Sequence, residues 1–373
     1  MHELIAAPFV GGYFVLRPDR LQGIKIPEVK FRELERGSAA GEACPVWLVD
    51  AASRRWGITL PGGRIDESVL FRQPPLYGHS RASWEINLGC DYDCEHCYLG
   101  EKRFAGLPDE GKFRMLHTLR DAGVLWLQIT GGEPLIDPGF IPSYRLAHEL
   151  GMMVEILSNG SRLGHAKTLE ALTALRPYRI SLSVYGATAE TYDGLTRRRG
   201  SFKRFSKGLA AGVEAGLPLD LSLIITSGNA HEQQRMRDWA GELALPYREY
   251  THMSPTIYGG AESLPSQSVA HLTTREPFKG CNAGHTFLHV DPHGLASICK
   301  VGRDEQINLM AEGVHGLSRL GAIADRLMLR TGGCSGCQLS ESCSVCRPLA
   351  KRYQGAKAPL KSYCQHGQKG SAA

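Results

Sequence analysis

Short apolar segments alternate with amphipathic stretches through the middle of the chain, from about residue 83 to residue 253. The apolar segments predict strands at 84–88, 124–130, 153–157, 178–185, 219–226 and 247–251. The stretches between them predict helices at 113–121, 144–150, 166–175, 202–215 and 232–243, and glycines suited to helix ends follow at Gly123, Gly151 and Gly216. This alternation indicates an α/β fold with a parallel sheet and right-handed crossovers.

The two flanking regions have different patterns. Residues 1–80 predict a small strand-rich module, in which residues 47–60 form a hairpin closed by Pro61, Gly62 and Gly63. After residue 255 the chain becomes rich in cysteine. We therefore expect three domains, at 1–80, 81–255 and 256–373.

Composition narrows the classes of partner. The 373 residues are 42% hydrophobic and carry a modest net charge of +5, with the basic residues mostly scattered, so charge does not indicate a nucleic-acid partner. The apolar stretch at 4–16 follows Glu3 and is interrupted by Gly11 and Gly12, unlike a signal peptide. No run approaches the roughly 18 apolar residues of a membrane span, so we expect no membrane partner.

Ten of the eleven cysteines fall in two regions with spacings typical of metal ligands. In a large chain without a leader this favours metal over disulfides, and hence a reducing, cytoplasmic location. The first region places Cys90, Cys94 and Cys97 directly after an apolar segment, and their thiolates could bind one iron–sulfur cluster with one iron left open. The alternatives are a zinc knuckle, which would need a fourth ligand, or a buried group of cysteines.

The C-x3-C-x2-C spacing resembles that of the radical S-adenosylmethionine (SAM) enzymes, in which SAM chelates the open iron of a 4Fe-4S cluster. The resemblance implies a partial six-strand (β/α) barrel. It also implies SAM contacts from segments that follow or lie on the strands: His96 at the family's aromatic position, Gly131, Gly132, Glu133 and Pro134 along the methionine end of SAM, Ser158 and Asn159 at its ribose, and Ser183. Thr196 stands where many relatives have a SAM-binding Arg, and Arg197 is the neighbouring alternative.

The second cysteine region resembles the SPASM domain, which binds two auxiliary 4Fe-4S clusters. Residues 287–290 and 295–299 predict a hairpin around a turn at 291–294, which brings Cys281 and Cys299 towards one site. By resemblance the distal cluster takes Cys334, Cys337, Cys343 and Cys364, and the proximal cluster takes Cys281, Cys299 and Cys346. The fourth proximal position is then open, or is filled by Cys44 or His285; a zinc ribbon is the alternative to both clusters.

The resemblance implies reductive cleavage of SAM to a 5′-deoxyadenosyl radical that abstracts hydrogen from a C–H bond. Our leading interpretation is a maturase that crosslinks or oxidises a ribosomally made precursor peptide, supplied with electrons by a flavodoxin or ferredoxin. A dehydrogenase of a sugar or alcohol is the alternative enzyme, and a non-catalytic iron–sulfur or zinc protein is the alternative class. Sulfatase maturation ranks low, because Lys300 occupies the position of that group's catalytic Asp. Residues 1–80 would be a leader-peptide-binding module or a structural cap.

Overall fold

The computed structural model describes residues 2–60, 63–100, 102–339 and 341–366. Its N-terminal part is a four-stranded sheet of order β3-β2-β1-β4 covered by helices. The elements in chain order are β1 (Leu4–Phe9), β2 (Gly12–Leu16), β3 (Ile24–Ile26), α1 (Glu28–Ala40), α2 (Val46–Trp56), α3 (Ile65–Ser68) and β4 (Val69–Phe71). Leu4, Val15, Phe31, Leu34 and Leu48 are buried in its core.

The hairpin predicted for residues 47–60 is wrong, because most of this segment forms helix α2. Leu48 and Ala52, one helical turn apart, are the residues of α2 that are buried. Pro45 precedes the helix, and Gly57 ends it in the left-handed conformation at φ 65°. Pro61 and Gly62, assigned to the closing turn, lie outside the described residues.

The central sheet has nine strands in the order β10-β9-β8-β7-β6-β5-β11-β12-β13. The predicted strands correspond to β5 (Arg81–Glu85), β6 (Trp126–Thr130), β7 (Met153–Ser158), β8 (Arg179–Val184), β9 (Leu219–Ile224) and β10 (Tyr247–Tyr250), which pair in parallel. The expectation of an α/β fold with a parallel sheet is confirmed. The sheet does not close, because β10 remains an edge strand.

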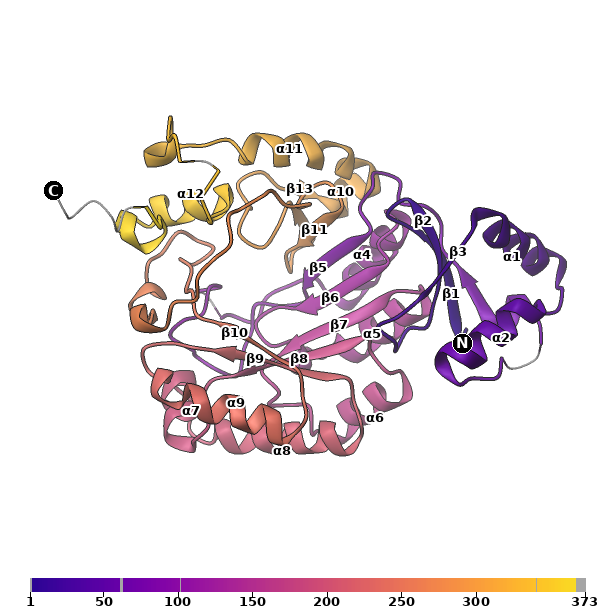
Figure 1. The fold of residues 1–373 in the computed structure, drawn as a ribbon, viewed down its shortest axis with the longest axis horizontal. Coiled ribbons are helices and arrows are strands. Elements are labelled where there is room, and N and C mark those ends of the chain that lie inside the picture. Colours follow the sequence, from indigo (N-terminus) through magenta and orange to yellow (C-terminus); the bar gives the residue numbers. More distant parts are fainter. Residues whose placement is uncertain (1, 61–62, 101, 340, 367–373) are drawn as a thin grey trace.

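The connecting helices are α4 (Asp109–Asp121), α5 (Phe140–Glu149), α6 (Ala166–Ala174), α7 (Ala189–Thr196), α8 (Ser201–Glu214) and α9 (Gln233–Glu242). Gly123, Gly151 and Gly216 follow α4, α5 and α8 at positive φ, as the sequence predicts. Figure 1 shows α6–α9 along one side of the sheet, the segment with α11 and α12 on the other, and the N-terminal module at one end.

The cysteine-rich part continues the central sheet. Strand β11 (Phe287–Val290) pairs in parallel with β5, and the predicted hairpin is present as β11 with β12 (Leu295–Ser297), followed by β13 (Ile307–Asn308). Asp291 accepts hydrogen bonds from the backbone N–H groups of His293 and Leu295 and so fixes the turn. The remaining helices are α10 (Leu309–Glu312), α11 (Leu320–Leu327) and α12 (Arg347–Gly355).

Two contacts attach the N-terminal module to the amino ends of the barrel strands. Ile5 and Leu16 form a common buried cluster with Leu125 and Met153. Arg72, which is 5% exposed, donates to the carbonyl oxygens of Leu150, Gly151, Arg120 and Val124 at 2.7–3.2 Å, where α4 and α5 end. The opposite, carboxyl ends of the strands are left for the site below. Within the described part of the chain no helix is long and apolar enough to cross a membrane.

Candidate cofactor site at the carboxyl ends of the strands

The three clustered thiols lie in the loop that follows β5. Burial raises the pKa of Cys90 to about 12 and that of Cys94 well above its usual value, and the neighbouring thiols raise both further. A thiolate there is costly without a bound cation, and iron would supply the missing positive charge. The three side chains therefore fit a metal cluster chemically better than they fit free thiolates.

Basic side chains and backbone groups hold this loop in place. Lys102 Nζ donates to the carbonyl oxygen of Cys94 at 3.0 Å, and Arg198 Nε donates to that of Asp91 at 3.0 Å. The Asp93 N–H donates to the Thr196 carbonyl at 2.9 Å. The end of α7 and the turn before α8 thus fix the cysteine loop from one side.

The Gly131–Gly132 pair packs against the loop from the other side. A Cβ on Gly132 would lie 2.0 Å from the carbonyl oxygen of Gly89, and one on Gly131 would lie 2.4 Å from that of Asn87. The N–H groups of Gly132 and Glu133 donate to those same two carbonyls at 2.9 and 2.8 Å. The space on the Cβ side of both glycines is filled by the chain's own backbone, and their contact with SAM stays a prediction. Because neither glycine has a side chain, this segment can approach the cysteine loop closely, and the backbone hydrogen bonds between them position that loop.

The Glu133 side chain also turns into the protein. It is fully buried, and Oε1 accepts from the Leu135 N–H at 2.9 Å and the Ser158 hydroxyl at 2.8 Å, while Oε2 accepts from the Asn159 N–H at 2.6 Å. Burial raises the pKa of Glu133 to about 7 against the effect of these donors. The carboxylate therefore joins the ends of β6 and β7.

Three further predicted SAM contacts lie next to Glu133: Pro134, Ser158 and Asn159. Pro134 is buried at the start of a 3₁₀ turn (Pro134–Ile136), and Asn159 Nδ2 donates to Asp91 at 2.9 Å and lies 3.7 Å from Cys90 Sγ. The structure brings these residues together near Cys90, and their contact with SAM stays a prediction. The Ser158 hydroxyl bonds to Glu133 and to the Gly160 N–H, and the Asn159 amide bonds to Asp91 and to the Ser161 N–H.

His96 and Ser183 are placed differently. The His96 ring lies 5.2 Å from that of Tyr185, its Nδ1 atom is buried without a hydrogen-bond partner among the described residues, and burial lowers its pKa to about 4. A neutral ring with an unsatisfied polar atom beside the cysteine loop fits a cofactor contact. Ser183 lines a cavity of about 450 Å³ on the inner face of the sheet.

Thr196 and Arg197 do not face that cavity. The Thr196 hydroxyl is fully buried and donates to the Tyr192 carbonyl at 2.8 Å. Arg197 lies 3.7 Å from Glu95 and borders a second cavity, of about 520 Å³, that touches Cys94 and Cys97 from outside.

The C-terminal cysteines form two groups. Burial raises the pKa of Cys334, and the charges of Cys343, Cys364 and Cys337 raise it further, so these four thiols are neighbours. In the second group, burial and then the charges of Cys299 and Cys281 raise the pKa of Cys346. The grouping matches that implied by the SPASM resemblance.

Neither proposed substitute for a fourth proximal ligand is directed at the second group. Cys44 packs against the core of the N-terminal module, and His285 Nε2 contacts Asp325 at 3.0 Å. Among the described residues, no set of three or more His, Cys, Asp and Glu is arranged to hold a metal ion.

Sequence reasoning missed a buried charge network between the two cysteine regions. Glu85 in β5 is fully buried and accepts from the Tyr98 hydroxyl at 3.1 Å and from both terminal nitrogens of Arg303 at 2.6 and 3.0 Å. Burial alone would raise the pKa of Glu85, but His289 and Arg303 hold it well below its usual range. The one sign of this network in the sequence was a carboxylate, Glu85, within the apolar segment at 84–88.

Comparison with known proteins identifies the class of domain. Residues 84–240 match the family described as the Radical SAM superfamily, so the chain contains a radical SAM domain. This confirms the resemblance drawn from the cysteine and glycine motifs.

Particular relatives match parts of the chain. It is 28% identical to the AdoMet-dependent heme synthase of Methanosarcina barkeri (48% of this chain, 51% of that protein) and 34% identical to the PqqA peptide cyclase of Ruegeria pomeroyi (43% of each). It is 31% identical to the mycofactocin maturase MftC of Mycobacterium tuberculosis (59% and 60%). The chain thus spans about half the length of these curated relatives. Streptococcus suis SuiB bound to SAM has the same fold, with a TM-score of 0.60 at 15% identity over 98% of this chain and 99% of SuiB.

Proposed function

We propose that this protein is a radical SAM enzyme that crosslinks or oxidises a precursor peptide. The observation that carries the proposal is the cysteine loop of Cys90, Cys94 and Cys97, held against the Gly131–Gly132 segment at the carboxyl ends of parallel strands, where α/β folds bind ligands. A 4Fe-4S cluster and SAM, when bound there, supply an electron and a 5′-deoxyadenosyl radical.

The chain's own residues would bind and orient these groups. The three thiolates would hold the cluster. The hydrogen bonds that join Glu133, Ser158, Asn159 and Asp91 would fix the cysteine loop beside it. His96, neutral and unsatisfied at Nδ1, offers SAM a hydrogen bond. The cavity lined by Ser183 and Tyr98 would hold the substrate's reacting C–H bond.

The proposal extends to the flanking regions. We assign residues 256–373 to a SPASM-type domain with two auxiliary 4Fe-4S clusters, supported by the two groups of thiols, with the fourth proximal position open. Residues 81–255 form the barrel. Residues 1–80 would bind a leader peptide, and the outer strand β3 leaves a sheet edge to which an extended chain can pair.

A peptide substrate is supported by the relatives named as a PqqA peptide cyclase and a mycofactocin maturase, and by SuiB, whose structure is known bound to the precursor peptide SuiA. A cytoplasmic flavodoxin or ferredoxin would supply electrons.

Coexpression with a short peptide encoded beside the gene tests the proposal. Mass spectrometry should show the peptide losing two hydrogen atoms with the wild type, and unchanged with Cys94→Ala. A peptide of unchanged mass beside enzyme that cleaves SAM would contradict the assignment of a peptide substrate.

A further inference from the structure

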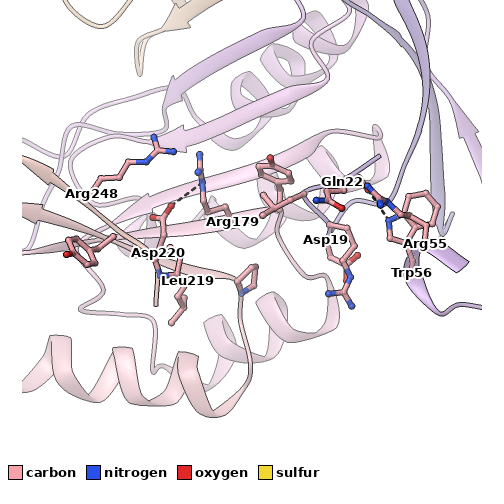
Figure 2. A pocket seen from close by; sticks show the side chains of 14 residues that line it. Asp19, Gln22, Arg55, Trp56, Arg179, Leu219, Asp220 and Arg248 are labelled. Carbon is pink, nitrogen blue, oxygen red and sulfur yellow. Dashed lines mark hydrogen bonds and ion pairs between the residues drawn. The ribbon is translucent and has the colours of Figure 1, made fainter. Parts of the chain in front are cut away.

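Two cavities of the barrel share three charged residues. One is the cavity of about 450 Å³ on the inner face of the sheet, which extends from Ser183 near the cysteine loop down to Arg179. The other, of about 560 Å³, lies between the amino ends of β8–β10 and the N-terminal module (Figure 2). Arg179, Asp220 and Arg248 line both, so the two cavities adjoin at these side chains, and we call them the joined cavities.

The walls carry more positive than negative charge. Five basic and three acidic side chains line the joined cavities. Every acidic side chain has a basic partner: Glu155 and Asp220 lie 2.5 and 3.4 Å from Arg179, and Asp19 lies 3.0 Å from Arg17. Each acidic wall side chain is therefore ion-paired within the protein, with Glu155 and Asp220 sharing Arg179, and the walls keep a net positive charge.

Three of the basic side chains have no such partner. Among the described residues, the side chains of Arg55, Arg248 and Lys300 make neither a hydrogen bond nor an ion pair. Arg55 lies at the outer mouth of the joined cavities, Arg248 at their junction and Lys300 at the inner end. Figure 2 shows Arg55 and Arg248 on opposite sides of the Arg179–Asp220 pair. Lys300 is half-buried next to Cys299, where an ammonium loses hydration that a carboxylate would replace.

We propose that the joined cavities bind an acidic segment of the peptide substrate, with carboxylates at Arg248 and Lys300. The inference rests on the proposed function and names the class of substrate. Basic side chains spaced along the walls, with acidic side chains between them, suit a chain whose Asp or Glu residues are spaced apart better than the continuous charge of a nucleic acid. Trp56 and Tyr247 give the groove apolar surface for the intervening residues.

Binding of two matched peptides tests this. The probes are a fluorescein-labelled peptide of alternating Glu and Gly and its Gln–Gly counterpart, titrated by fluorescence anisotropy with the reconstituted protein and SAM. The wild type should prefer the Glu peptide, and Arg248→Gln and Lys300→Gln should each weaken binding of that peptide by about tenfold to a hundredfold, the effect of one charged hydrogen bond. The Gln peptide should bind equally to all forms.

Arg235→Gln, an exposed change on the outer helix α9, is the matched control and should leave both titrations unchanged. Because Lys300 adjoins Cys299, Arg248→Gln is the decisive variant if Lys300→Gln loses iron. No preference for the Glu peptide, or an equal loss with Arg235→Gln, would overturn the inference. SAM cleavage measured on the same samples separates the two claims, because cleavage without Glu preference refutes the acidic segment alone.

Discussion

Replacing Glu85 by Gln should strongly destabilise the protein. The amide keeps the volume but removes the charge, and its NH₂ group then opposes a guanidinium N–H of Arg303. Arg303 has a side chain only 10% exposed, so it would be left as an unpaired buried cation. Breaking a buried ion pair by removing one partner costs about 3–5 kcal/mol, and we expect a loss near 3 kcal/mol because Tyr98 and the arginine can still bond the amide oxygen.

Urea unfolding followed by circular dichroism measures this loss. Glu170→Gln, at an exposed position of α6, is the control and should change the unfolding free energy by less than about 0.5 kcal/mol. The double variant Glu85→Gln/Arg303→Met, with neither charge, should be more stable than Glu85→Gln alone. A Glu85→Gln protein within about 1 kcal/mol of the wild type would refute the reasoning.

The same carboxylate predicts a pH dependence. The pKa of Glu85 in the folded protein lies below its ordinary value of 4.5, so its contribution to stability is present above pH 4.5 and is lost as the pH falls below it. Glu85→Gln should therefore lose less stability than the wild type on acidification. A parallel loss in both proteins would show that Glu85 is not ionised in the fold.

Three further changes test separate parts of the structure. Gly132→Ala should displace the cysteine loop and lower the iron content after reconstitution, while Gly194→Ala, whose Cβ would meet no neighbouring atom, should not. Equal iron in the two variants would contradict the close contact between Gly132 and the Gly89 carbonyl. Arg72→Met leaves four carbonyls without their donor and should cost about 3 kcal/mol or more in urea unfolding, and a cost under 1 would show that water replaces it. Because the pKa of Glu133 is raised to about 7, wild-type stability should fall as the pH rises from 4.5 to 7, and Glu133→Gln should flatten that fall; an unchanged slope would refute the assignment.

The strands of the barrel could be predicted from the sequence, whereas the helices of the N-terminal module could not. Parallel strands are short apolar runs between amphipathic helices, a pattern set by burial on both faces, and β6–β10 appear within a few residues of their predicted ends. In α2 the apolar residues Trp47, Leu48 and Val49 are contiguous, so strand and helix could not be separated until the packing of Leu48 and Ala52 was known.

The candidate site was predictable in its residues but not in their contacts. Spacing alone grouped Cys90, Cys94 and Cys97, and family motifs added Gly132 and Glu133. Spacing cannot show that the Cβ side of Gly132 meets backbone or that Glu133 bonds to the end of β7, because those contacts depend on how the loops after β5, β6 and β7 cross. The partner of Glu85 lies 218 residues away in the chain, beyond the reach of any local pattern.

Reductive cleavage of SAM by the anaerobically reconstituted protein tests the central claim most directly. With dithionite and SAM, the wild type should form 5′-deoxyadenosine and methionine. The variant with Cys90, Cys94 and Cys97 all replaced by Ala should form neither, while keeping the iron bound by its C-terminal cysteines. Undiminished cleavage by that variant would contradict the account.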